Sequence, residues 1–216
     1  MLERERERVA AASHRLAREG LVLGTAGNVS ARHGDLVAIT PTGATLEQLT
    51  AEQVTVVDLD GALVAGELAP TSELALHLGA YRRRDAGAVV HTHAPMATAL
   101  ACVLEELPIV HYQMLALGGP VRVAPYATFG SQELARLTLD ALEDREAVLM
   151  SNHGTLALGG DVEVATDHTL LLEWAATIYW RAAAIGAPRL LGEPQIGAYH
   201  QMLADRSYGS LQKARE

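Results

Sequence analysis

Residues 89–95 read Val89-Val90-His91-Thr92-His93-Ala94-Pro95, a pattern typical of a buried strand that ends in a turn. Side chains alternate between the two faces of an extended chain, so His91 and His93 project to the same side. Two imidazoles at this spacing can bind one metal ion without bending the backbone. Pro95 has no N–H group for a sheet hydrogen bond, so the strand ends before it. The pair alone is equally typical of two histidines in contact with water, so a metal site requires further ligands elsewhere in the chain.

The composition indicates a globular protein with one sizeable core. The chain has 216 residues, of which 49% are hydrophobic and 20% are charged. Its net charge of -9 at pH 7 argues against a nucleic-acid partner or an anionic membrane partner, because such surfaces depend on Lys and Arg. No repeat, low-complexity segment or linker interrupts the sequence. We therefore expect residues 1–216 to form a single domain.

The sequence also carries information on the compartment. Cys102 is the only cysteine, so no intrachain disulfide can form, and we expect it to be a small buried residue in a reducing environment. The chain begins with alternating Glu and Arg, which is typical of a charged helix and not of a signal peptide. No uninterrupted apolar segment is long enough to cross a bilayer. These features predict a soluble, cytoplasmic protein.

Hydrophobic periodicity predicts short strands that alternate with helices. Helices are expected at residues 2–19, 70–83, 96–104, 131–142 and 162–187, and a last one after Pro194. Besides the strand that ends before Pro95, strands are expected at residues 36–40, 54–58, 62–64, 109–112, 121–125, 147–150 and 155–158. This alternation indicates an α/β layered fold.

His153 has the placement of a third metal ligand. It follows the apolar strand at residues 147–150 and precedes Gly154, which permits a tight turn. This position at the end of a strand is equivalent to that of the His-x-His pair. Neighbouring strands can therefore bring the three imidazoles together.

Glu73 has the placement of a fourth ligand, in the first turn of the helix that begins near residue 70. Thr71 or Ser72 is expected to be the N-cap of this helix, and the helix dipole favours a carboxylate there. The alternative role is a capping-box glutamate, which is the commoner use of Glu in a first turn. Three imidazoles and one carboxylate suit a divalent ion such as zinc, which can polarise a carbonyl as a Lewis acid. We assign no role to the remaining histidines, which are His14, His33, His77, His111, His168 and His200.

Three short motifs are suited to bind an anion: Gly27-Asn28, Thr42-Gly43 and Thr71-Ser72. Each falls at a junction between a strand and a loop or between a loop and a helix, where backbone N–H groups are free. Such groups can hold a phosphate with little net positive charge. Each motif is common by itself. Together, with Glu73 directly after the third, they indicate an anion site beside the metal site.

Five motifs follow one another in a characteristic order. They are Ala26-Gly27-Asn28-Val29-Ser30, Thr40-Pro41-Thr42-Gly43, Thr71-Ser72-Glu73, His91-Thr92-His93-Ala94 and Asn152-His153-Gly154. In this order they resemble the class II aldolase/adducin family, and most closely its fuculose-phosphate branch. The likeness covers essentially the whole chain, including residues 124–130 and Tyr208-Gly209.

The resemblance implies a three-layer αβα fold in which a central, mostly antiparallel sheet lies between helices. It also implies a homotetramer with active sites at the subunit interfaces and one zinc ion per subunit. The implied zinc ligands are Glu73, His91, His93 and His153. The implied phosphate-binding residues are Gly27, Asn28, Thr42, Gly43, Thr71 and Ser72.

The implied activity is that of an aldehyde-lyase. It is the reversible cleavage of a ketose 1-phosphate, such as L-fuculose 1-phosphate or a similar deoxy-sugar phosphate, to dihydroxyacetone phosphate and an aldehyde such as L-lactaldehyde. Glu73 matches the residue that moves the proton at the carbon next to the carbonyl. Tyr112 matches a tyrosine from the neighbouring subunit that protonates the aldehyde oxygen, and Tyr208 matches a tail tyrosine that closes over the substrate. Thr71 departs from the serine usual in the fuculose-phosphate branch but keeps the hydroxyl.

Three other functions belong to the same resemblance. An L-ribulose-5-phosphate 4-epimerase uses a similar carbon–carbon cleavage but needs acid and base groups on both faces of the aldehyde, and the additional acidic and tyrosine pair is not clearly placed here. A related sugar-phosphate dehydratase or decarboxylase stays open. A non-enzymatic, adducin-type role is disfavoured because all four metal ligands are present.

Overall fold

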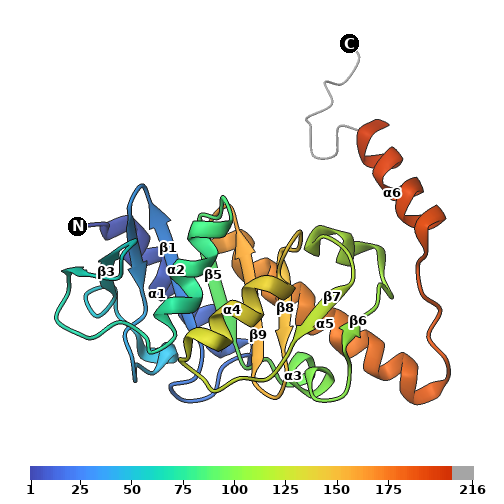
Figure 1. Ribbon diagram of the computed structural model, residues 1–216, viewed down its shortest axis with the longest axis horizontal. Coiled ribbons are helices and arrows are strands. Elements are labelled where there is room, and N and C mark those ends of the chain that lie inside the picture. Colours follow the sequence, from blue (N-terminus) through green and yellow to red (C-terminus); the bar gives the residue numbers. More distant parts are fainter. Residues whose placement is uncertain (206–216) are drawn as a thin grey trace, which may run out of the picture.

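A computed structural model describes residues 1–205 of the chain. A nine-stranded sheet runs through its centre in the order β4-β3-β2-β1-β5-β9-β8-β7-β6. Neighbouring strands are antiparallel except for the parallel pair β7–β8. Figure 1 shows that α6 projects away from the sheet beyond β6. The expected mostly antiparallel sheet is confirmed.

The bounds of the elements agree with most of the sequence predictions. The strands are β1 (Asn28–His33), β2 (Leu36–Ile39), β3 (Thr55–Asp58), β4 (Leu63–Ala65), β5 (Ala88–Thr92), β6 (Glu106–Leu107), β7 (Val121–Ala124), β8 (Ala147–Met150) and β9 (Gly154–Gly159). The helices are α1 (Glu3–Arg18), α2 (Leu74–Arg83), α3 (Pro95–Ala101), α4 (Gln132–Ala141), α5 (Val162–Ile185) and α6 (Glu193–Asp205), with short 3₁₀ helices η1 (Leu46–Gln48) and η2 (Tyr112–Leu117).

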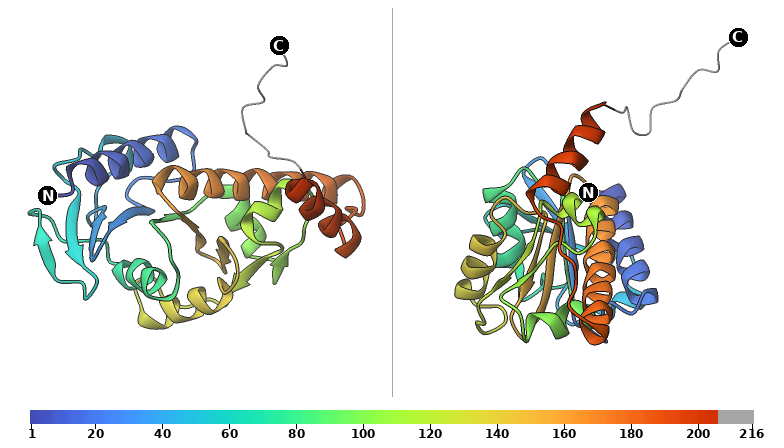
Figure 2. Two further views of the ribbon diagram at one scale, coloured as in Figure 1. Left: turned by 90° about the horizontal axis from the view of Figure 1, so that it is seen from above. Right: turned by 90° about the vertical axis from the view of Figure 1, so that its right-hand side faces the viewer.

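Helices cover both faces of the sheet, with α1 and α5 on one face and α2 and α4 on the other (Figure 2). Because the central strands are covered on both faces, successive side chains enter two separate cores. In β5, Val90 packs in the core that contains α1 and α5, and Val89 packs in the core that contains α2 and α4. Full burial of a side chain of this size contributes about 1.5–3 kcal/mol. The predicted three-layer αβα architecture is confirmed.

The same alternation decides which face carries the polar residues of the central strands. Val29 of β1 and Val90 of β5 point into the core beneath α1 and α5. The residues between and beside them, Asn28, Ser30 and His91, therefore point toward α2. All three are buried, so the layer between the sheet and α2 is polar at this end of the sheet.

The predicted strand at residues 109–112 is wrong. The strand in this region is β6, at residues 106–107, and η2 begins at Tyr112. The His111 ring accepts a hydrogen bond from the backbone N–H of Gln113, and Gly118 ends η2 in the left-handed conformation. These local hydrogen bonds favour a turn over an extended chain.

The expectation that Cys102 is buried is also wrong. It is exposed, because α3 ends at Ala101 and Cys102 follows as its C-cap residue.

The sequence expectation on membrane spans can be compared with the length and hydropathy of the helices. Within residues 1–205, no helix is both long enough and apolar enough to cross a membrane.

The helix that follows the His-x-His motif is capped from a distant part of the chain. α3 has seven residues and no side-chain cap of its own. Instead, the Glu173 carboxylate of α5 accepts hydrogen bonds from the backbone N–H groups of Met96 (2.9 Å) and Ala97 (2.8 Å). A carboxylate at a helix N-terminus satisfies otherwise unpaired donors and interacts favourably with the helix dipole. Glu173 therefore fixes the chain as it leaves the motif.

We expect Glu173→Ala to lower the free energy of unfolding by about 2 kcal/mol, because two hydrogen bonds to a charged group are lost. Glu163→Ala is the matched control on the same helix, since Glu163 forms an exposed ion pair with Arg8. Loss of this ion pair should lower the free energy of unfolding by less than about 1 kcal/mol. Urea unfolding measures both variants, and an equal loss of stability in the two would contradict the capping role.

Candidate metal centre and active site

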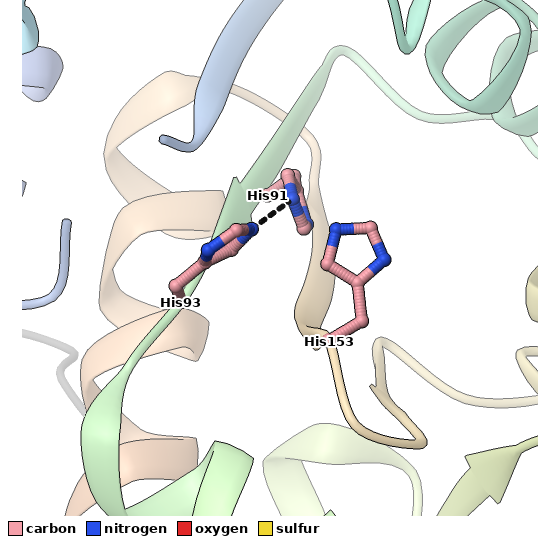
Figure 3. Close-up of side chains that lie close together, drawn as sticks. All are labelled: His91, His93 and His153. Carbon is pink, nitrogen blue, oxygen red and sulfur yellow. Dashed lines mark hydrogen bonds between the residues drawn. The ribbon is translucent and has the colours of Figure 1, made fainter. Parts of the chain in front are cut away.

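Three imidazoles and one carboxylate converge at the end of β5. The candidate ligand nitrogens of His91, His93 and His153 all lie within 4.8 Å of one another, and Figure 3 shows the rings gathered around one point. The Nε2 atoms of His91 and His93 are 3.2 Å apart. Glu73 completes the group, with Oε2 3.1 Å from His91 Nε2 and Oε1 3.5 Å from His153 Nε2. The structure brings together all four residues that the sequence predicts as metal ligands.

The ring of His91 is fixed with its Nε2 lone pair toward this group. β5 is hydrogen-bonded to β1 and β9, where His91 pairs with Asn28 and Leu156. His91 Nδ1 lies 2.8 Å from the carbonyl oxygen of Thr155. Because a carbonyl only accepts, Nδ1 carries the hydrogen, and Nε2 is free to bind a cation. Metal-binding histidines are commonly oriented by such a hydrogen bond.

His153 reaches the group through the turn between β8 and β9. Asn152 adopts the left-handed conformation (φ 54°), and the N–H of His153 donates to the carbonyl of Met150 at 3.1 Å. The tight turn predicted at Gly154 is thus supplied by Asn152. Gly154 is needed for another reason, since a Cβ atom there would lie 2.2 Å from the carbonyl oxygen of Thr92. The close approach of these backbones brings His153 next to β5.

Glu73 lies at the N-cap position of α2, one residue before its first turn. Neither Thr71 nor Ser72 is the N-cap, and the Glu73 side chain makes no capping hydrogen bond, so the capping-box alternative is wrong. Its backbone N–H donates to Thr71 Oγ1 (3.3 Å), and its Oε2 accepts from Asn28 Nδ2 (2.9 Å). Oε1 is buried without a hydrogen-bond partner among residues 1–205. A buried carboxylate oxygen with no hydrogen-bond partner, beside three imidazoles, is suited to bind a cation.

Burial and mutual charge set the protonation of the group. Burial lowers the pKa of His93 to about 4, and the neighbouring His91 and His153 add to the effect. Burial would raise the pKa of the Glu73 carboxyl. The attraction of His91 and the hydrogen bonds that Glu73 accepts from His91 and Asn28 outweigh burial and hold that pKa below its usual value. Glu73 in turn raises the pKa of His91 against the effect of burial. Metal ions bind neutral imidazoles and ionised carboxylates, so a cation at this site would displace the proton that Glu73 favours on His91.

The three predicted anion-binding motifs lie side by side next to this group. The backbone N–H of Thr42 donates to Ala69 at 3.0 Å, and that of Thr71 donates to Thr40 at 3.1 Å, so the second and third motifs run alongside each other. The first motif joins them where Asn28 donates to Glu73. Thr42, Gly43 and Ser72 are exposed, whereas Asn28 and Thr71 are buried. The expectation that backbone N–H groups are free in these motifs is wrong for Thr42 and Thr71, because both already donate to backbone carbonyls.

Gly27 has a special backbone role in the first motif. Its φ is 87°, and a Cβ atom there would lie 3.0 Å from the carbonyl oxygen of His91. Any larger residue would push this loop away from β5. The glycine therefore allows the motif to lie directly against the strand that carries two of the imidazoles.

Of the two predicted catalytic tyrosines, the structure describes Tyr112. Tyr112 begins η2 and is half-exposed, and its ring packs against His111 at 4.5 Å and Tyr199 at 6.0 Å between ring centroids. It lines a cavity of about 580 Å³ together with Leu171 and Met202. Tyr208 lies outside the described residues. The catalytic roles of both tyrosines stay predictions.

The sequence analysis did not single out one polar group that borders the site. His77 and Tyr81 of α2 are buried; His77 is hydrogen-bonded directly to Asn28, and Ser30 links the hydroxyl of Tyr81 to the other ring nitrogen of His77. Glu73, His77 and Tyr81 are spaced four residues apart and so share one helix face, but this spacing marks a polar group only once the facing strand is known.

A family model described as "Class II Aldolase and Adducin N-terminal domain" matches residues 7–180. The chain belongs to the class II aldolase family. It is 41% identical over 200 residues to a 5-deoxy-D-ribulose 1-phosphate aldolase of Bacillus thuringiensis serovar kurstaki, covering 91% of this chain and 93% of that protein. It is also 41% identical over 175 residues to the L-fuculose phosphate aldolase of Escherichia coli K12, covering 80% and 81%.

A solved structure of an L-fuculose 1-phosphate aldolase superimposes with a TM-score of 0.88 at 35% identity, covering 93% of this chain and 96% of that one. The predicted family, the αβα fold and the class of enzyme, an aldolase and hence an aldehyde-lyase, are confirmed. Class II aldolases depend on a metal ion, and the three imidazoles are a group that can hold one.

Replacement of a single imidazole should abolish metal binding. We expect wild-type protein to retain about one zinc ion per chain after dialysis, and His91→Ala and His93→Ala to retain almost none, because a site with too few ligands loses its geometry. His33→Ala, at an exposed position on β1, is the control and should keep the ion. Elemental analysis measures the metal content, and full zinc occupancy in both ligand variants would refute the assignment.

Proposed function

We propose that this chain is a zinc-dependent aldolase that cleaves a ketose 1-phosphate reversibly to dihydroxyacetone phosphate and an aldehyde. One observation carries the proposal: a buried carboxylate and three imidazoles adjoin three glycine- or hydroxyl-containing loops, two of which expose Thr42, Gly43 and Ser72. A metal site next to a phosphate site suits a ketose 1-phosphate, because its carbonyl group and its phosphate group lie next to each other at one end of the molecule. The substrate would bind its phosphate through Gly27, Asn28, Thr42, Gly43, Thr71 and Ser72.

Zinc is the ion proposed for Glu73, His91, His93 and His153. Nitrogen ligands with one carboxylate suit zinc, and zinc binds such sites more tightly than manganese or cobalt does. When bound, zinc supplies a Lewis acid that polarises the ketose carbonyl. The protein residues orient the substrate and move its protons.

The proposed roles of the side chains follow from the bonds that change. In cleavage, the C3–C4 bond breaks, its electron pair moves toward the carbonyl group, and the C4 hydroxyl loses its proton and becomes the aldehyde. Tyr112 of a neighbouring subunit would relay that proton to solvent, and Glu73, after taking up a proton from solvent, would deliver it to C3 to complete dihydroxyacetone phosphate. Tyr208 would close over the substrate. The active unit would be a homotetramer, in which Tyr112 of one subunit would reach the site of its neighbour. Each subunit would be a single domain over residues 1–216. The protein would be cytoplasmic.

The names of the relatives narrow the substrates worth testing. One is a 5-deoxy-D-ribulose 1-phosphate aldolase and another an L-fuculose phosphate aldolase. Both names describe phosphorylated deoxy sugars. We therefore propose a deoxyketose 1-phosphate as the substrate of this chain.

The deciding experiment measures release of dihydroxyacetone phosphate from 5-deoxy-D-ribulose 1-phosphate and from L-fuculose 1-phosphate. Chelated protein and zinc-restored protein are compared side by side. We expect zinc-dependent release from at least one of the two. No release from either, with zinc bound in stoichiometric amount, would reject the proposed substrate class, and ribulose 5-phosphate would then test the epimerase alternative.

Glu73→Gln tests the proton-transfer role separately. The amide keeps an oxygen ligand but cannot act as a base, so zinc should stay partly bound. Exchange of the C3 proton of dihydroxyacetone phosphate with solvent should slow by about 10²–10⁴-fold, the usual contribution of a positioned base. The exchange is followed by NMR in deuterated buffer. Exchange at the wild-type rate would remove Glu73 from this role.

A further inference from the structure

A chain of buried polar side chains runs from Glu73 into the interior of the protein. Asn28 Nδ2 donates to Glu73 Oε2 (2.9 Å), and the Asn28 oxygen is bonded to His77 Nε2. His77 Nδ1 is 2.7 Å from Ser30 Oγ, which is 2.6 Å from the hydroxyl of Tyr81. All five side chains are buried, and the last three are at most 3% exposed. A buried polar network of this kind fixes the geometry of its members when every group is satisfied, and it is costly when one group is left without a partner.

This chain of hydrogen-bonded side chains is possible because four residues of a helix and two residues of a strand span similar distances. Glu73, His77 and Tyr81 lie four residues apart on or next to α2, a rise of about 6 Å per step. Asn28 and Ser30 lie two residues apart on one face of β1, a rise of about 6.7 Å. The helix residues therefore stand in register with the strand residues, and the polar side chains interleave.

The direction of every hydrogen bond follows from the carboxylate. An ionised carboxylate only accepts, so Asn28 must present its NH₂ group to Glu73 and its oxygen to His77. His77 must then donate from Nε2, which leaves Nδ1 as an acceptor for the Ser30 hydroxyl. The Ser30 oxygen in turn accepts from Tyr81. One tautomer of His77 alone satisfies this sequence of donors and acceptors.

We propose that His77 is a positioning residue: held in its Nε2–H tautomer by Ser30 and Tyr81, it orients the Asn28 amide, which in turn holds Glu73 Oε2 and leaves Oε1 turned toward the imidazoles. Asn28 thereby belongs to the support of the base as well as to the phosphate loops. The kinetic part of this inference rests on the proposed function.

The surroundings of His77 fit a neutral ring of fixed tautomer. His77 is fully buried, and burial lowers its pKa to about 3, with the nearby His91 adding to the effect. A neutral imidazole has one donor and one acceptor, which is the pair that Asn28 and Ser30 require. A residue that only filled space would not need this pattern.

The tautomer is measured directly, without any catalytic assay. In protein labelled with ¹⁵N-histidine and loaded with zinc, long-range ¹H–¹⁵N correlation spectra distinguish a protonated ring nitrogen from an unprotonated one. The His77 signals are those that disappear in His77→Gln. We expect a protonated Nε2 and an unprotonated Nδ1. The Nδ1–H tautomer, or rapid averaging of the two, would overturn the inference.

Kinetics of proton exchange on dihydroxyacetone phosphate tests the consequence. His77→Phe keeps a ring but removes both hydrogen bonds, and it should lower kcat for exchange by about 10–100-fold, as is usual for residues that orient a metal site. KM should change less than kcat, because the other proposed phosphate-binding residues, Gly27, Thr42, Gly43, Thr71 and Ser72, make no contact with His77 in this chain of hydrogen bonds. His77→Gln keeps a donor for Asn28 and should recover kcat to within a few-fold of wild type.

A matched serine pair separates positioning from packing. Ser30→Ala removes a hydroxyl from the chain, whereas Ser13→Ala removes an equally buried hydroxyl that bonds within α1 to Val9. We expect kcat to fall in the first variant and to stay at the wild-type value in the second. Wild-type kcat in folded, zinc-loaded His77→Phe, or equal losses in His77→Phe and His77→Gln, would overturn the inference. If wild-type protein itself exchanges no proton, the proposed function fails, and the tautomer of His77 still decides the structural part.

Discussion

Pairing of β5 with β1 on one side and with β9 on the other is the constraint on which the site depends. It sets Asn28 opposite His91, and it brings the Thr155 carbonyl to the His91 ring. The turn that leads into β9 lies so close to Thr92 that only glycine fits at position 154. The imidazoles are thus positioned by backbone hydrogen bonds of the sheet. They are close together before any cation binds.

The buried charge of Glu73 links stability to function. An ionised carboxylate in a protein interior costs several kcal/mol unless charges and hydrogen bonds compensate it. Here His91 and Asn28 compensate one oxygen, and the other has no hydrogen-bond partner in the described part of the chain. A divalent cation would complete the compensation. Since it would bind the folded chain and not the separated ligands of an unfolded one, it would also favour folding.

The sequence predicted those parts of the structure that follow from local periodicity. His91 and His93 could be assigned because a strand repeats every two residues, and His153 because it ends an apolar strand. The order of the nine strands depends on long-range pairing, which no local pattern contains. Local hydrogen bonds replaced the predicted strand near His111 with a turn, and His77 was missed because a histidine on a helix has no distinctive pattern until the facing strand is known.

The central claim is that one metal ion is held by the imidazoles and by the Glu73 carboxylate together. Anomalous diffraction from crystals of the zinc-loaded protein, measured on both sides of the zinc absorption edge, tests it most directly. We expect one strong peak per chain, about 2.0–2.2 Å from a nitrogen of each of the three histidines and from a Glu73 oxygen. A peak at another place, or a zinc ion held by the histidines while Glu73 of the substrate-free protein stays out of reach, would contradict it.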